Sequence, residues 1–264
     1  MSEPVLFDAF MYAGEEAMLE MRLHELNGYA RYHVLTEAPI NHRGYPKPLH
    51  YQENMRLRGA WHHKVFPVVA RDLPMGIDDN WGREHAQRNA AWPVINERAS
   101  DDDVVLIADL DEFPNAAALE WRGPGDVVSL HMRTALFAVD REVPAHLLPP
   151  TAVMAKVGWL RRQGGDLAGV RDRRGSWPVM QNAGWHFSWI GGPEVQRSKL
   201  ERRTCHTELL TSPEGALIAS GERWRTTEDG GGLPVVDVEI DESWPQWIRD
   251  RKAPPEWYRP REAV

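Results

Sequence analysis

Cysteine is almost absent from the sequence, because the 264 residues contain only Cys205. An internal disulfide and a cysteine-rich zinc site are therefore excluded. Long apolar runs are absent too, since none approaches the roughly 18 residues that a membrane-spanning helix needs. The first residues also lack a basic segment followed by an apolar stretch. We therefore expect a soluble, cytoplasmic protein with no membrane span.

Basic charge is in the minority, with 31 Lys and Arg residues against 39 Asp and Glu residues and a formal net charge of −8. No long basic stripe is present, so we expect no nucleic-acid partner. Arginines gather only at 161–162, 171–174 and 202–203. Each of these clusters is either a solvated surface or a place for a small anion such as a diphosphate.

The remaining composition is that of an ordinary globular protein, with 42% hydrophobic and 27% charged residues. The length suits one large α/β domain. From residue 229 onward the composition shifts to glycine and then to proline, tryptophan and arginine. We therefore predict one domain over residues 1–228 and an irregular tail over residues 229–264 that packs on it through its tryptophans.

The first half alternates between predicted strands and helices. Short apolar and aromatic residues predict a strand at 5–11, and apolar residues recur at helical spacing within 15–26, with Arg22 among them. The further elements predicted here are strands at 32–37, 64–69 and 104–108 and a helix over 81–98 with a kink or boundary at Pro93. Such alternation favours an α/β fold with a mostly parallel, Rossmann-like sheet flanked by helices.

The second half is less regular. A short helix is predicted at 115–121, one or two strands within 126–139, an aromatic strand at 184–190 and a helix over about 194–203.

The feature with the clearest chemistry is Asp109-Leu110-Asp111-Glu112, which follows the apolar run 104–108. Ligands of open parallel sheets bind outside the carboxyl ends of the strands. Two carboxylates at i and i+2 in such a place suit Mg²⁺ or Mn²⁺ that carries substrate phosphates. The alternative is that these acids only form a turn and cap the helix that follows. The burial of the preceding strand favours the metal–diphosphate interpretation.

Several further segments stand in order between about residues 7 and 215: Phe7-Asp8-Ala9-Phe10, residues 15–26, residues 44–49, Arg88-Asn89, residues 108–114, residues 184–189 and Cys205-His206-Thr207-Glu208. Together they resemble glycosyltransferase family 17, a family of β-1,4-N-acetylglucosaminyltransferases acting on N-glycans. The resemblance implies a GT-A fold, a UDP-sugar donor, most commonly UDP-N-acetylglucosamine, and inverting transfer with a divalent metal to a glycan or other acceptor. The chain departs from the family at Ala17, where an acidic residue is common.

Under this resemblance Asp111 is the surest ligand of Mn²⁺ or Mg²⁺, and Asp109 contacts the metal through water or holds the donor ribose. GT-A enzymes commonly add a late histidine to the metal, which is His206 here, with His186 as the second choice. The catalytic base is expected to be Glu194, which follows Gly191-Gly192 at a helix start, with Glu208 as the alternative.

Five further residues are assigned to the donor site. Glu37 ends the second strand and is expected to hold the ribose or uracil, and Lys47 and Arg88 are expected to neutralise phosphate or fix the base. Ordinary surface ion pairing is the alternative for both cations. Phe10 lies in the first matching segment. Trp185 is the tryptophan expected to stack on a sugar face.

Two rival functions are kept. A haloacid-dehalogenase-type phosphohydrolase also has an Asp-X-Asp motif after an apolar strand, but that motif normally lies near the amino terminus. The second rival is a non-catalytic, carbohydrate-binding, transferase-like module. Ala17 is consistent with this rival, because the family commonly has an acidic residue at that position.

Overall fold

The computed structural model describes residues 3–76, 79–192, 195, 199 and 235–259. The chain divides into two compact units. Unit 1 comprises Met1–Met132 and Pro150–Gly184, and unit 2 comprises Arg133–Pro149 and Trp185–Val264. The predicted division into a domain over 1–228 and a tail over 229–264 stays a prediction, because residues 200–234 lie outside the described residues.

Unit 1 is built on a seven-stranded sheet with the order β10-β6-β9-β4-β1-β2-β3. The strands are β1 (Leu6–Met11), β2 (Ala30–Glu37), β3 (Val65–Val69), β4 (Val104–Ile107), β6 (Val127–Leu130), β9 (Ala152–Lys156) and β10 (Val179–Met180). Strands β4, β1, β2 and β3 run parallel, as do β6 and β10, whereas β9 is antiparallel to both β4 and β6. This confirms the predicted fold class, with a central and mostly parallel sheet.

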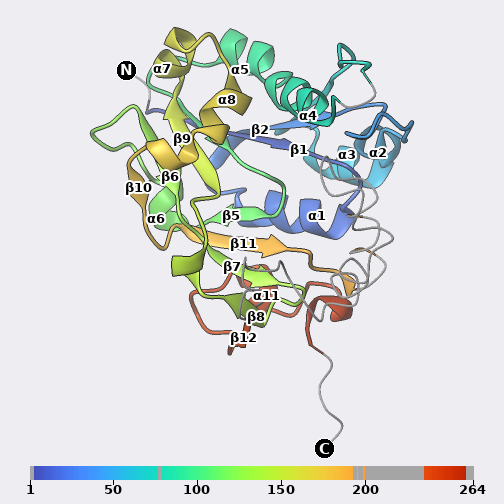
Figure 1. Cartoon of the computed structure of the whole chain (residues 1–264), viewed down its shortest axis with the longest axis vertical. Coiled ribbons are helices and arrows are strands. Elements are labelled where there is room, and N and C mark those ends of the chain that lie inside the picture. The colour runs from blue at the N-terminus through green and yellow to red at the C-terminus, as the bar shows by residue number, and fades with distance from the viewer. Residues whose placement is uncertain (1–2, 77–78, 193–194, 196–198, 200–234, 260–264) are drawn as a thin grey trace, which may run out of the picture. The chain divides into compact units, whose positions relative to one another are not determined.

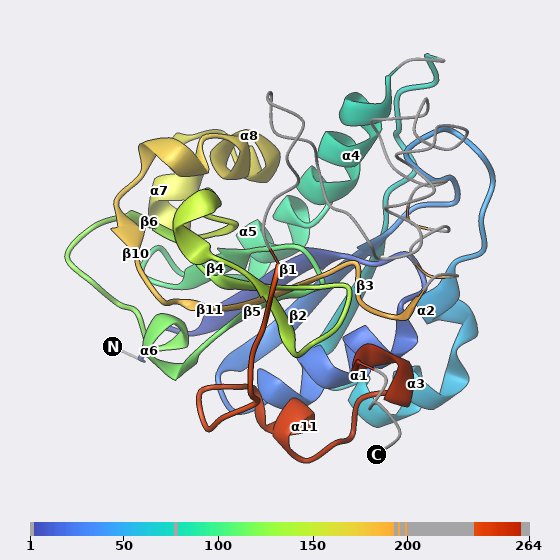
Figure 2. The ribbon, with the colours of Figure 1, turned by 60° about the horizontal axis from the view of Figure 1, so that its bottom comes forward.

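Helices cover both faces of this sheet (Figures 1 and 2). Helices α4 (Asn80–Asn89), α5 (Trp92–Arg98), α7 (Val157–Arg162) and α8 (Leu167–Asp172) lie on one face, and α1 (Glu16–Glu25) and α3 (Met55–Trp61) lie on the other. The short helices α2 (His50–Glu53) and α6 (Ala116–Leu119), the 3₁₀ turn η2 (Arg174–Ser176) and the short strand β5 (Glu112–Pro114) complete unit 1.

Strand β1 shows how the sequence determines these two faces. Successive side chains of a strand point to opposite faces. Phe7 and Ala9 belong to the apolar cluster that includes Ile95 of α5 and Leu160 of α7. Asp8, between them, therefore faces α1, where it meets Arg22.

The predicted helix over 81–98 is two helices. α4 ends at Asn89, and α5 begins at Trp92 with Pro93 in its first turn. Proline has no backbone N–H, so it disrupts a helix interior but is tolerated in a first turn. The boundary predicted at Pro93 is confirmed.

In unit 2 the strands β12 (Val236–Asp237), β8 (Arg141–Val143), β7 (Arg133–Leu136) and β11 (Gly184–Ser188) are neighbours in that order. The unit also holds helix α11 (Gln246–Arg249) and the 3₁₀ turns η1 (Ala145–Leu147) and η4 (Pro255–Trp257). Trp244 and Trp257 are buried. The predicted packing of a tail over residues 229–264 on the domain stays a prediction. Among the described residues, no helix has the length and apolar character needed to cross a membrane.

Candidate functional site

The Asp109–Glu112 segment directly follows β4, as the sequence predicted, and turns the chain into β5, which begins at Glu112. β1 and β4 are parallel neighbours, so their carboxyl ends share the edge of the sheet that this turn extends. Every residue of β4 is buried, whereas Asp109 and Asp111 are half-buried. The strand therefore delivers two carboxylates to a partly solvated edge, where ligands of such sheets bind.

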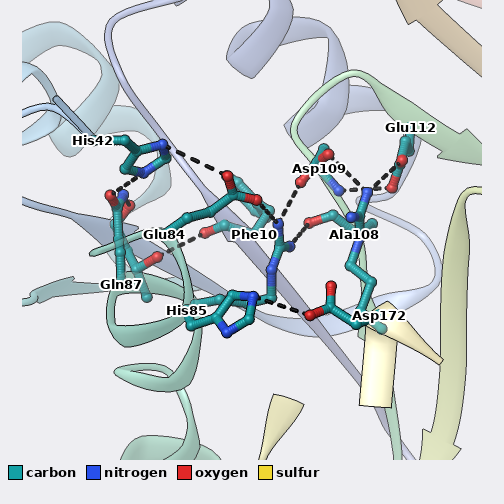
Figure 3. A network of polar contacts seen from close by, with 12 residues as sticks. Phe10, His42, Glu84, His85, Gln87, Ala108, Asp109, Glu112 and Asp172 are labelled. Carbon is teal, nitrogen blue, oxygen red and sulfur yellow. Dashed lines mark hydrogen bonds and ion pairs between the residues drawn. The ribbon is translucent and has the colours of Figure 1, made fainter. Parts of the chain in front are cut away.

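Two arginines hold the carboxylate of Asp109 (Figure 3). Arg88 of α4 donates from Nη2 to Asp109 Oδ1 at 2.8 Å, and Arg171 of α8 donates from Nη2 to Oδ2 at 2.7 Å. The backbone N–H of Asp109 donates to Glu112 Oε2 at 2.7 Å. Both carboxylate oxygens of Asp109 are thus engaged by side chains that converge from two helices on the same face of the sheet.

Arg171 also binds the nearly fully buried carboxylate of Glu112, at 2.7 Å. Burial opposes its charge, but the carboxylates of Asp109 and Glu112 outweigh burial and raise the pKa of Arg171. The guanidinium therefore stays charged, and it links the first and last residues of the turn. For Arg174, burial and the neighbouring Arg171 lower the pKa. In the arginine cluster at 171–174, Arg171 is thus part of an ion-pair network within the protein.

A second buried network lies under the turn, on the α1 face of the sheet. Arg22 forms a bidentate pair with Asp8, at 2.6 and 3.0 Å, and His33 Nδ1 lies 2.8 Å from Asp8 Oδ2. Burial tends to raise the pKa of Asp8, but Arg22 and His33 outweigh it and hold that pKa below its usual value. Asp8 is therefore ionised, and His33 Nδ1 donates to it.

Further polar groups extend from α4 (Figure 3). His42 Nε2 lies 3.1 Å from Gln87 Oε1, and the side-chain amide of Gln87 donates to the Thr36 carbonyl at 3.0 Å. Burial lowers the pKa of His42, and Glu84, 3.9 Å away, opposes that shift. His85 Nε2 lies 2.9 Å from Asp172 Oδ2 and so connects α4 to α8.

The other donor-site residues predicted in unit 1 lie at the carboxyl ends of β1 and β2 or in the loop after β2. Phe10 is buried, and the Arg22 guanidinium carbon lies 4.8 Å from its ring centroid. Glu37 is buried and accepts from the backbone amides of Tyr51 and Gln52, and burial raises its pKa. Lys47 lies close enough to Glu37 to oppose that shift. Their donor contacts stay predictions.

The remaining predicted residues lie elsewhere. Trp185 and His186 are on β11 in unit 2. The Trp185 ring is buried, with Trp244 stacked on it at 3.8 Å and the Arg133 guanidinium carbon 3.9 Å from its centroid. A sugar contact would need that indole to be uncovered. Glu194, His206 and Glu208 lie outside the described residues.

The described residues fit a single divalent metal ion, most of whose ligands would come from the substrate phosphates. Within them, no group of three or more His, Cys, Asp and Glu side chains is placed to hold a metal. Asp109 is engaged by two arginines, and Asp111 is half-buried at the same edge of the sheet, so its role as a metal ligand stays a prediction. Magnesium-type ions are commonly held by one or two carboxylates together with substrate phosphates, so this arrangement fits such an ion.

Sequence reasoning did not assign a role to Asp8, Arg22, Glu112 or Arg171. Asp8 lies within an apolar strand, and Arg22 lies on the apolar face of a predicted helix. A charged residue in an apolar pattern signals a buried ion pair, since such residues are almost never fully buried unless paired.

Comparison with known proteins finds similarity to glycosyltransferases. The model of glycosyltransferase family 17 matches residues 2–191. Human and rat proteins named beta-1,4-mannosyl-glycoprotein 4-beta-N-acetylglucosaminyltransferase are each 27% identical over an alignment of 213 residues. The alignments cover 67% of this chain and 39% and 38% of those proteins. The chain thus spans about two fifths of the length of these relatives. The fold was also compared with a crystal structure of the galactosyltransferase LgtC in complex with donor and acceptor sugar analogues. The superposition covers 95% of this chain and 92% of LgtC, with 12% sequence identity and a TM-score of 0.33. A likeness this weak supports no assignment.

Proposed function

Because the chain belongs to glycosyltransferase family 17, we propose that it transfers a sugar from a nucleotide-sugar donor to a hydroxyl of a glycan or similar acceptor. The family match covers 72% of the chain, from 190 of 264 residues, and contains the whole Asp109–Glu112 turn. The observation that carries the proposal is this turn, because it places two carboxylates at the ligand-binding edge of a parallel sheet. The proposed donor is UDP-N-acetylglucosamine, after the transferases that the chain resembles.

The proposed reaction is a single displacement with inversion at the anomeric carbon. Asp111 would hold a Mn²⁺ or Mg²⁺ ion, which supplies positive charge to the departing diphosphate. Arg88 and Arg171 hold the two carboxylate oxygens of Asp109 in place. Asp109 would contact the ion through water or hold the donor ribose, and His206 or His186 would be the further metal ligand.

A base must remove the proton of the acceptor hydroxyl as that oxygen attacks the sugar. We assign this role to Glu194, with Glu208 as the alternative, on the family resemblance alone. The other proposed donor contacts are Phe10, Glu37, Lys47 and Trp185.

The test combines binding and turnover. UDP with MnCl₂ is expected to raise the melting temperature, and Asp111→Ala is expected to abolish that shift because it removes the proposed metal ligand. The matched control is Asp102→Ala, an exposed acid just before the amino end of β4, which should leave the shift unchanged.

The rival functions give other outcomes. Absence of both a thermal shift and turnover of any nucleotide sugar would refute the transferase. Release of phosphate from a phosphomonoester would indicate a hydrolase. Glycan binding without nucleotide would indicate a non-catalytic module. A shift that survives Asp111→Ala would place the metal elsewhere.

A further inference from the structure

Arg22 is a fully buried cation that binds the backbone of the Asp109–Glu112 turn. Its Nη1 atom lies 3.1 Å from the carbonyl oxygen of Asp109, 3.2 Å from that of Leu110 and 2.7 Å from that of Glu112. The rest of the guanidinium binds the Asp8 carboxylate. One side chain of α1 therefore gathers three carbonyls of the turn and is itself anchored on β1.

The surroundings of Arg22 fix it in this position. His33 of β2 binds the same Asp8 carboxylate, so the anchor is held from two strands. The rings of Phe10 and Phe113 lie 4.8 and 5.8 Å from the guanidinium carbon. A planar guanidinium with a fixed fork of donors suits this arrangement, and a lysine ammonium could not satisfy the carboxylate and the carbonyls together.

The cost of this arrangement argues for a role beyond packing. An apolar residue at position 22 would continue the buried face of α1, whose neighbours Met18, Leu19 and Leu23 are all buried. Buried ion pairs often add little net stability compared with apolar residues of similar size. What an apolar residue could not do is bind the three carbonyls of the turn.

We propose that Arg22 is a positioning residue for the metal and donor site, an inference that rests on the proposed function. By holding the carbonyls of residues 109, 110 and 112, Arg22 sets the directions of the Asp109 and Asp111 side chains. Arg22 is fully buried, so it would act through the turn. Partners that orient metal ligands in this indirect way typically contribute about 10- to 100-fold to metal affinity or activity.

The experiment measures binding of UDP in the presence of MnCl₂ by calorimetry, beside the melting temperature of each variant. Arg22→Lys and the double variant Asp8→Asn with Arg22→Met are expected to bind about 10- to 100-fold more weakly than the wild type. The double variant leaves no unpaired buried charge, and the amide introduced at position 8 still offers an oxygen to His33, so this variant should remain folded.

The matched control is His33→Leu, which removes a member of the same buried network that does not contact the turn. It should lower the melting temperature but reduce affinity much less than the Arg22 variants do, because Arg22 keeps both of its contacts with Asp8. Loss of affinity in His33→Leu equal to that in the Arg22 variants would overturn the proposal, because a general structural role would then explain both.

Wild-type affinity in a folded Arg22 variant would also overturn it, and so would failure of both Arg22 variants to fold, since Arg22 would then be a residue of the folding core. A wild-type protein that does not bind UDP with MnCl₂ would instead refute the proposed function. The two failures are therefore distinguishable.

Discussion

At the scale of single residues, Arg171 is a buried cation between two carboxylates of the candidate site. Its Nη2 atom lies 2.7 Å from both Asp109 and Glu112. The exposed pairs of Arg56 with Glu16 and Glu20 have similar distances, of 2.6 and 2.8 Å. Water screens the exposed pairs but not the buried one, so equal geometry should give unequal energies.

Arg171→Met is therefore expected to lower the free energy of unfolding by about 3 kcal/mol, because it leaves Glu112 as a buried charge without its arginine. Arg88 remains on Asp109 and limits the loss. Arg56→Met, the exposed control, should cost much less, because solvent screens its ion pairs. Urea unfolding measures both, and equal losses in the two variants would show that Arg171 is no better shielded than a surface residue.

At the scale of secondary-structure elements, β5 depends on a close approach by Gly184. A Cβ atom at Gly184 would lie 2.1 Å from the Phe113 carbonyl oxygen and 2.7 Å from the Pro114 Cα. The φ of Gly184 is also +144°, which side chains rarely adopt. Because the obstacle is backbone of β5 itself, it cannot move aside as a side chain would.

Gly184→Ala should accordingly destabilise the chain by about 3 kcal/mol, from strain and displacement of β5. Gly59→Ala in α3, where the added Cβ meets nothing within 4 Å, should instead stabilise it by about 0.5–1 kcal/mol. Thermal or urea unfolding compares the two. A Gly184→Ala protein of wild-type stability would contradict the close approach.

At the scale of the whole molecule, acid stability should depend on His42. Burial holds the folded pKa of His42 below its ordinary value of 6.5, so on acidification the unfolded chain takes up this proton first. The free energy of unfolding therefore has its full value, as far as His42 is concerned, above about pH 6.5. It decreases as the pH falls from there towards the folded pKa, by at most about 1.4 kcal/mol per pH unit.

His42→Gln should therefore flatten the dependence of unfolding free energy on pH between 7 and 5. Exposed His62→Gln is the control and should retain the wild-type slope. Denaturant titrations at several pH values measure this dependence. If the slope of unfolding free energy against pH is unchanged in His42→Gln, His42 does not cause the acid sensitivity.

The sequence could predict most of the first half of unit 1 because its elements are regular. The strand at 104–108 is an apolar run, the helix at 15–26 has helical spacing, and Pro93 marks a boundary, all of which are local signals. β9 was not predicted, because its pairing with both β4 and β6 is a long-range property of the fold.

The candidate site was predictable to a similar extent. The turn at 109–112 was located by the strand before it, but its partners Arg22 and Arg171 are 87 and 62 residues from Asp109 along the chain. Only the fold brings them together. Arg22 within an apolar helical face was a local sign of burial, whereas nothing local distinguished Arg171 from the other arginines of its cluster.

The place of β9 also affects how the protein is made. β4, the strand that leads into the Asp109–Glu112 turn, is flanked in the sheet by β1 and β9. During synthesis β1 is available before β4, but β9 emerges 45 residues after Ile107, at Ala152. Until then one edge of β4 is open to pairing with other chains. The nascent chain therefore exposes this edge of β4 from the time that β4 leaves the ribosome until β9 has left it as well.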